Sequence, residues 1–199
     1  MYEVQANAST LLMIGRREDN TSLLAVEPSA EAVLVNAVLE GDREQFARLY
    51  DLYARMVHGI LLARVPRDEV DDLVQDIFLH ALRKLHTLRN AAAFGSWIAM
   101  IARNRAMDFH RNSRPTMQLD GDAAEAGGPE SNPTLAGQIL DMIRGLPDAY
   151  RETLVLRLVE GMTGPEIAER TGLTPASVRV NLHRGMKLLR TKLGSKEGL

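Results

Sequence analysis

The densest group of chemistry-bearing residues is a run of five basic side chains, with no acidic one, within residues 174–192. At 100° per residue, a helix here would place on one face Ala176, Arg179, Val180, His183, Arg184 and Lys187. Its opposite face would be apolar and would consist of Val178, Leu182, Gly185 and Leu189. Such a helix suits the major groove of DNA, where arginine pairs with guanine and small apolar groups contact thymine methyls. The alternative is a solvated basic face, which the absence of acids disfavours because solvated helices usually mix signs.

The residues before this run predict a helix-turn-helix. A short helix is expected over residues 163–170, followed by a turn that contains Gly172. Thr174 suits the N-cap of the next helix and Pro175 its first position, because a hydroxyl accepts an orphan N–H there and proline lacks a donor. This motif presents its second helix for recognition.

A second basic segment spans residues 94–115, where four arginines outnumber a single aspartate. As a helix, it has a polar face with Asn104 beside Arg103, Met107, Arg111 and Arg114. Its apolar face consists of Phe94, Ile98, Ile101, Ala102 and Phe109. Arg105 falls within the apolar arc, where Asp108 at i+3 is its expected partner. Trp97 lies at the edge of this arc, and the sequence leaves open whether it packs in the core or stacks on an unpaired base.

The helix expected over residues 67–86 is acidic. Pro66 and the carboxylates after it suit a first turn. Opposite its apolar arc lies an exposed stripe of Asp72, Gln75, Asp76, Leu79 and Arg83. A leucine flanked by carboxylates suits a protein partner, since carboxylates repel DNA phosphate; a merely solvated face is the alternative.

These elements predict an all-α protein of two small domains. The 199 residues are 45% hydrophobic but only 5% aromatic, which favours helices over a β-sandwich or barrel. Residues 1–29 lack a helical period and predict a disordered tail. Residues 115–138 hold four acids and no base among several Gly and Pro, and predict a flexible acidic linker between helical domains at 30–114 and 139–199. With a flexible linker of this length the two domains need not touch.

Composition and spacing exclude several classes of function. Because the chain has no cysteine, disulfides, Cys-ligated zinc and thiol catalysis are ruled out. The five histidines lack metal-ligand spacing, and no phosphate-cradling loop or nucleophile motif occurs, so we expect neither an enzyme nor a cofactor. No signal peptide or membrane-length apolar stretch is present, so we expect a cytoplasmic protein without membrane insertion.

Three stretches together carry a resemblance to a known family. They are DDLVQDIFLHALRKL, FGSWIAMIARNRAMDFHR and, after the acidic linker, LPDAYRETLVLRLVEGMTGPEIAERTGLTPASVRVNLHRGMKLLR. Over residues 30–114 and 139–193 the chain resembles the extracytoplasmic-function (ECF) group of bacterial RNA polymerase sigma factors. The resemblance implies a region 2 domain that binds core polymerase and the −10 element, a region 4 domain that binds the −35 element, and nucleation of DNA melting.

The resemblance also implies which residues form each surface. Carried over by position, the core-polymerase surface comprises Asp72, Gln75, Asp76, Leu79 and Arg83. The −10 surface comprises Asn90, Trp97, Arg103, Asn104, Arg111 and Arg114. The −35 surface comprises Thr174, Ser177, Arg179, Val180, His183, Arg184 and Lys187. The implied partners are the β′ clamp helices and β flap of core polymerase, promoter DNA and an anti-sigma factor.

Three points stay open from the sequence. Many members have a polar residue at the position of Val180 and a basic one at Asn181, so the promoter sequence does not transfer. A stand-alone helix-turn-helix regulator is the alternative function, and it would bind duplex DNA without polymerase. The acidic linker also suggests the hypothesis that it shields the basic helices within the molecule.

Overall fold

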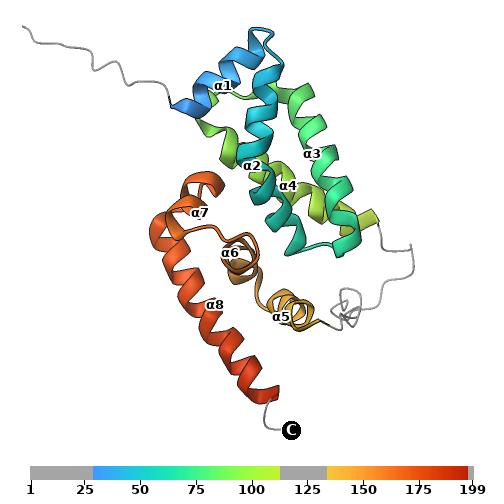
Figure 1. The fold of residues 1–199 in the computed structure, drawn as a ribbon, viewed down its shortest axis with the longest axis vertical. Coiled ribbons are helices and arrows are strands. Elements are labelled where there is room, and N and C mark those ends of the chain that lie inside the picture. The colour runs from blue at the N-terminus through green and yellow to red at the C-terminus, as the bar shows by residue number, and fades with distance from the viewer. Residues whose placement is uncertain (1–28, 113–133, 197–199) are drawn as a thin grey trace, which may run out of the picture.

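The structure, a computed structural model, describes residues 29–112 and 134–196, which form helices joined by short turns (Figure 1). The α-helices are α1 (Ala30–Leu39), α2 (Glu44–Leu62), α3 (Val70–Lys84), α4 (Phe94–Asn112), α5 (Leu135–Arg144), α6 (Asp148–Leu158), α7 (Gly164–Thr171) and α8 (Pro175–Lys196). Three short 3-10 helices are η1 (Arg67–Glu69), η2 (Leu85–Thr87) and η3 (Ala91–Ala93). The all-α class is confirmed, because the described ranges contain no strand. None of their helices is long and apolar enough to cross a membrane.

Helices α1 to α4 enclose an N-terminal core because each carries an apolar stripe. Helix α2 contributes Met56 and Ile60, which are fully buried. Phe94 opens α4 and packs against Tyr53 of α2, with ring centroids 5.3 Å apart. Helix α3, with η1 before it and η2 after it, occupies the place predicted for a helix over residues 67–86.

Helices α5 to α8 form the C-terminal group, in which α8 runs along one side of the molecule (Figure 1). The buried side chains of this group include Ile143, Leu154 and Ile167. Helix α5 begins at Leu135, inside the segment predicted as linker. Thr134 caps it, because its hydroxyl accepts a bond from the Gly137 N–H at 3.1 Å. The rest of the predicted linker lies outside the described residues.

The two groups of helices lie against each other, although a linker of the predicted length does not require them to touch. Helix α6 packs on α2 at Gly59, where a Cβ atom would lie only 2.7 Å from Leu156 Cδ2. Helix α7 meets α2 and α4, and Arg170 Nη1 donates to the Leu52 carbonyl oxygen at 2.9 Å. The absence of a side chain at Gly59 permits close contact between the domains, and the Arg170 bond stabilises it. The apolar periodicity of each domain could not predict this contact.

Candidate nucleic-acid interface

The turn between α7 and α8 has the backbone of a helix-turn-helix. Thr163 and Glu166 form a capping box at the start of α7, and Pro165 occupies the first turn. Bonds from the backbone and hydroxyl of Thr163 lower the pKa of the Glu166 carboxyl. Gly172 ends α7 with a φ of 74°, the left-handed conformation that glycine adopts at least cost. The predicted helix-turn-helix is therefore present.

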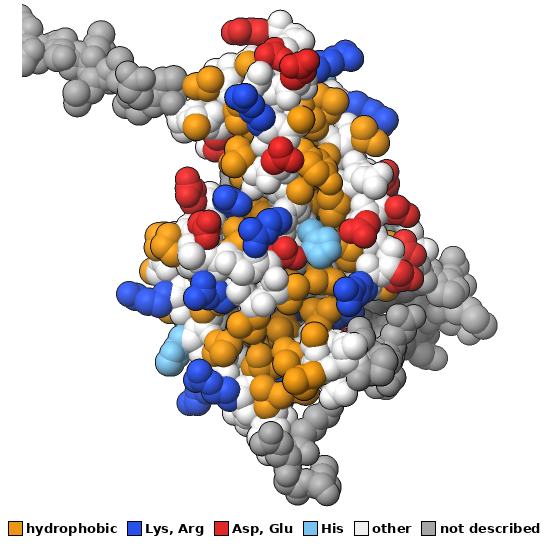
Figure 2. Space-filling view, in the orientation of Figure 1, with side chains coloured by type: hydrophobic (Ala, Val, Ile, Leu, Met, Phe, Trp, Pro, Cys, Tyr) orange, Lys and Arg blue, Asp and Glu red, His pale blue; other side chains and the backbone are white. Residues whose placement is uncertain are grey.

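Helix α8 divides into the two predicted faces. On its inner face Val178 and Leu189 are buried, and Gly185 lets α6 approach, because a Cβ there would lie 2.9 Å from Leu154 Cδ1. On its outer face the exposed residues are Ala176, Arg179, Val180, His183, Arg184 and Lys187. No ion pair within residues 29–112 and 134–196 engages the three cations of this face. Lys and Arg side chains gather over α8 in Figure 2.

The first turn of α8 is fixed by its cap. Thr174 Oγ1 accepts a bond from the Ser177 N–H at 3.1 Å, and the two hydroxyls lie 2.8 Å apart. Both side chains are exposed at the end of the helix that carries the basic outer face. They therefore fix the start of α8 and remain exposed to solvent.

The residues expected at the −10 element do not form one uniform surface. Asn90 is exposed and caps η3, where its side chain accepts from the Ala92 N–H at 3.1 Å. Trp97 is half-buried, with its ring centroid 5.8 Å from that of Phe94, so it both packs and reaches the surface. Asn104 is exposed, and so is Arg111, which pairs with Asp108 at 2.8 Å; Arg114 lies outside the described residues.

Arg103, also expected at the −10 element, instead contacts the other domain. Its Nε and Nη2 donate to the two carboxylate oxygens of Glu152 at 3.1 and 2.7 Å. Arg64 Nη2 lies 2.7 Å from Glu152 Oε2 on the same carboxylate. Burial alone would raise the pKa of Glu152, but the two guanidinium groups outweigh it and hold this pKa below its ordinary value. The group is therefore a charged carboxylate, 5% exposed, between two arginines.

The acidic stripe on α3 is exposed as predicted, and Asp and Glu side chains gather on this side in Figure 2. Its members are Asp72, Gln75, Asp76, Leu79 and Arg83. The Leu79 residue is 51% exposed to solvent. Asp76 Oδ2 accepts a bond from Arg105 Nη2 at 3.1 Å. The expected pair of Arg105 with Asp108 is therefore wrong. The partner of Arg105 comes from α3, which lies beside α4, and Asp108 forms an ion pair with Arg111 instead.

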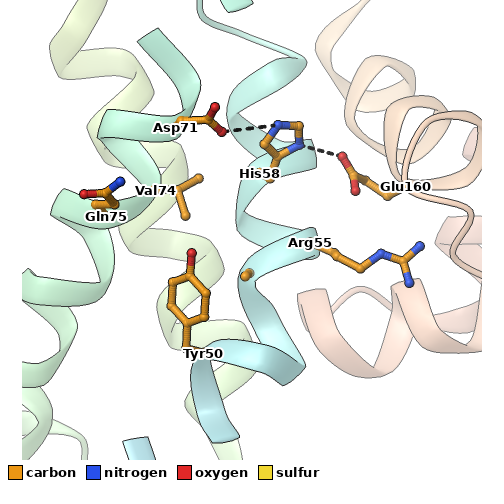
Figure 3. A pocket seen from close by; sticks show the side chains of 8 residues that line it. Tyr50, Arg55, His58, Asp71, Val74, Gln75 and Glu160 are labelled. Atoms are coloured by element: carbon orange, nitrogen blue, oxygen red, sulfur yellow. Dashed lines mark hydrogen bonds and ion pairs between the residues drawn. The ribbon is translucent and has the colours of Figure 1, made fainter. Parts of the chain in front are cut away.

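A further polar contact joins the domains at the edge of a cleft of about 390 Å³ between α2 and α3 (Figure 3). His58 of α2 lies between two carboxylates, with Nδ1 2.7 Å from Glu160 Oε1 and Nε2 3.9 Å from Asp71 Oδ1. The hydrogen bond to Glu160 raises the pKa of His58 despite its partial burial. The described residues hold no group of three His, Asp or Glu side chains suited to a metal ion.

The sequence alone does not point to Glu152, Arg64, His58 and Glu160, because their partners lie in the other domain. One signal was available: Glu152 is four residues before the buried Leu156, so it shares the apolar face of α6. A carboxylate on such a face requires a cationic partner.

A basic helix-turn-helix, joined to a second helical domain with an arginine-bearing helix, defines a two-domain DNA-binding protein. The Sigma-70 region 2 family matches residues 49–116, and the Sigma-70 region 4 family matches residues 136–189. The chain belongs to the ECF group of RNA polymerase sigma factors, which act in transcription initiation.

Two relatives that are at least 30% identical match over nearly their whole length. The RNA polymerase sigma factor CarQ of Myxococcus xanthus is 32% identical over 165 residues, which cover 79% of this chain and 94% of CarQ. The ECF RNA polymerase sigma-E factor of Escherichia coli strain K12 is 30% identical over 184 residues, covering 84% of this chain and 96% of that protein. The structure of CnrH in complex with the cytosolic domain of CnrY shares the fold, with a TM-score of 0.57 and 24% identity over 83% of this chain and 97% of that chain.

Proposed function

We propose that this sigma factor recognises the −35 element of its promoters with the outer face of α8. One observation carries the proposal: the inner face of α8 is buried, while Arg179, Arg184 and Lys187 are exposed and without ion pairs in the described chain. The N-terminal residues of a recognition helix contact base edges, so Arg179 and Val180 are placed for base contacts and Lys187 for phosphate. Thr174, Ser177, His183 and Arg184 complete this surface.

We further propose that the N-terminal domain binds the −10 element and opens it. Asn90 lies in the exposed segment before α4, and Trp97 presents part of its ring nearby. Unpaired bases stacked on an aromatic ring and bound by a polar loop are held out of the duplex, which melts DNA without ATP hydrolysis. Asn104, Arg103, Arg111 and Arg114 supply polar and cationic contacts to the strand.

The stripe on α3 is proposed to bind core RNA polymerase through the clamp helices of β′, while the C-terminal domain contacts the β flap. Leu79 is half exposed between charged neighbours, which is the composition of a protein interface and not of a DNA surface. An anti-sigma factor is a further expected partner, because membership of the ECF group implies one. The similar CnrH fold is itself seen in complex with another protein, the cytosolic domain of CnrY.

The −35 proposal is tested with core polymerase and a promoter library, comparing the wild type with Arg179→Ala. The matched control is Arg190→Ala, which removes the same charge from α8 about 16 Å farther along the helix axis. Arg179→Ala is expected to relax the −35 sequence preference by roughly tenfold at one base position, since a bidentate pair contributes about 1–3 kcal/mol of discrimination. An unchanged preference in Arg179→Ala, or an equal change in Arg190→Ala, would refute this assignment.

A further inference from the structure

The contact between the domains brings three charged side chains together in an arrangement that recognises phosphate. Arg103 of α4 binds both oxygens of Glu152, and Arg64, directly after α2, binds one of them. Guanidinium groups bind carboxylate and phosphate with the same planar, forked donors. Two arginines on one domain thus converge on a single anionic group, and in this molecule the anion comes from the other domain.

Both arginines belong to the N-terminal domain. Arg64 Nη1 donates to the Ile60 carbonyl oxygen at 3.1 Å, which fixes its side chain against α2. The Arg64 side chain is 15% exposed and that of Arg103 is 29% exposed, and separating the domains would remove the Glu152 carboxylate from both guanidinium groups. Arg103 shares α4 with Trp97 and Asn104, which places the pair beside the surface proposed for the −10 element.

We propose that Arg64 and Arg103 form a binding site for a backbone phosphate of promoter DNA, and that Glu152 occupies this site while the two domains are in contact. The inference rests on the proposed function, because it takes promoter DNA as the ligand. It adds Arg64 to the DNA-binding residues. It also gives the C-terminal domain a second role, since Glu152 and a DNA phosphate cannot bind the same pair at once. The free protein therefore has its −10 side partly masked.

The close fit beside the pair offers a way to open the contact without changing a charge. A Cβ at Gly59 would lie 2.7 Å from Leu156 Cδ2 and 2.8 Å from Glu160 Cγ, so a long side chain there must push α6 away. Gly59→Gln and Glu152→Gln thus expose the same arginines by different means. Asp148→Asn is the matched control, because it removes the same charge from α6 at a residue whose ion pair, with Arg151, lies within the C-terminal domain.

The test measures binding of the full-length protein, without polymerase, to a fluorescein-labelled single-stranded DNA of mixed sequence at several salt concentrations. Glu152→Gln and Gly59→Gln are each expected to raise the affinity roughly fivefold, and Asp148→Asn by less than about twofold, since only the first two unmask the pair. Adding Arg64→Ala to Glu152→Gln is expected to abolish the gain. It should also lower the slope of log affinity against log salt by about 0.7, the contribution of one phosphate contact.

Two further variants separate a phosphate contact from a merely structural role. Arg64→Lys in the Glu152→Gln background keeps the charge and is expected to retain the salt slope, whereas Arg43→Ala, which removes an exposed arginine before α2, should leave the affinity gain in place. An unchanged salt slope when Arg64→Ala is added to Glu152→Gln would overturn the phosphate site. Failure of both Glu152→Gln and Gly59→Gln to raise affinity would overturn the masking.

Transcription with core polymerase, measured on the same preparations, distinguishes failure of the phosphate site from failure of the proposed function. If the wild type initiates at promoters and the opening variants gain no DNA affinity, the inference is wrong while the proposed function stands. If the wild type gives no polymerase-dependent initiation, the proposed function itself is refuted, whatever the oligonucleotide binding shows.

Discussion

Gly172 allows the geometry of the helix-turn-helix to be tested with a single methyl group. Its φ of 74° is left-handed, and its Cβ position lies 2.7 Å from Ser96 Cβ in α4 of the other domain. Gly172→Ala therefore carries two costs. The left-handed conformation costs an L residue about 1–2 kcal/mol, partly offset by about 0.4–1 kcal/mol from the stiffer unfolded chain. The contact with Ser96 adds to this, because carbon atoms pack at about 3.5–4.0 Å.

The two costs separate in a double-mutant cycle with Ser96→Gly, which removes the opposing carbon atom. Urea unfolding followed by circular dichroism should show that Gly172→Ala lowers the free energy of unfolding by about 1 kcal/mol in the Ser96→Gly background and by more than that in the wild type. An equal loss in both backgrounds would refute the interdomain contact at Ser96. No loss in either background would refute the left-handed turn.

Two more predictions concern the contact between the domains and the packing of α8 on α6. The pKa of His58 is raised above its ordinary 6.5 by Glu160, so its stabilising contribution is complete below about pH 6.5 and is lost as pH rises through the raised pKa. The wild type should lose more free energy of unfolding between pH 6 and pH 9 than His58→Gln does, and an equal loss in the two proteins would contradict this. Leu154→Ala should cost about 2–5 kcal/mol in unfolding experiments and weaken −35 recognition, because Leu154 is fully buried against α8. Leu158→Ala, at a residue 45% exposed on the same helix, should cost less than about 1 kcal/mol, and comparable costs would refute the packing.

The amphipathic faces of single helices could be predicted from the sequence because they depend on spacing along one element. The division of α8 into a buried Val178 side and an exposed Arg179 side follows from its 3.6-residue period and is confirmed. The stripe around Leu79 on α3 is exposed for the same reason. The start of α5 could not be placed, because Gly137 resembles linker sequence while in the structure its N–H binds the Thr134 cap.

Partners that lie on different helices could not be predicted in this way. Asp108 was the natural choice for Arg105 on a single helix, yet Asp76 lies closer across the packed pair of α3 and α4. The same limit applies to Glu152, which lies 49 residues along the chain from Arg103 and meets it only because the domains are in contact. Ion pairs of this kind depend on tertiary geometry, which periodicity does not encode.

Under the proposed function, this sigma factor directs promoter-specific initiation by binding core polymerase through α3. The most direct measurement is reconstituted transcription with sigma-free bacterial core polymerase and a genomic promoter library, comparing the wild type, Asp76→Arg and the exposed control Glu40→Arg. Circular dichroism checks that Asp76→Arg, which faces Arg105, is folded. We predict promoter-specific transcripts with the wild type and Glu40→Arg, and none with Asp76→Arg. Full activity of folded Asp76→Arg, or duplex DNA binding by the protein alone with no initiation from core polymerase, would contradict the account.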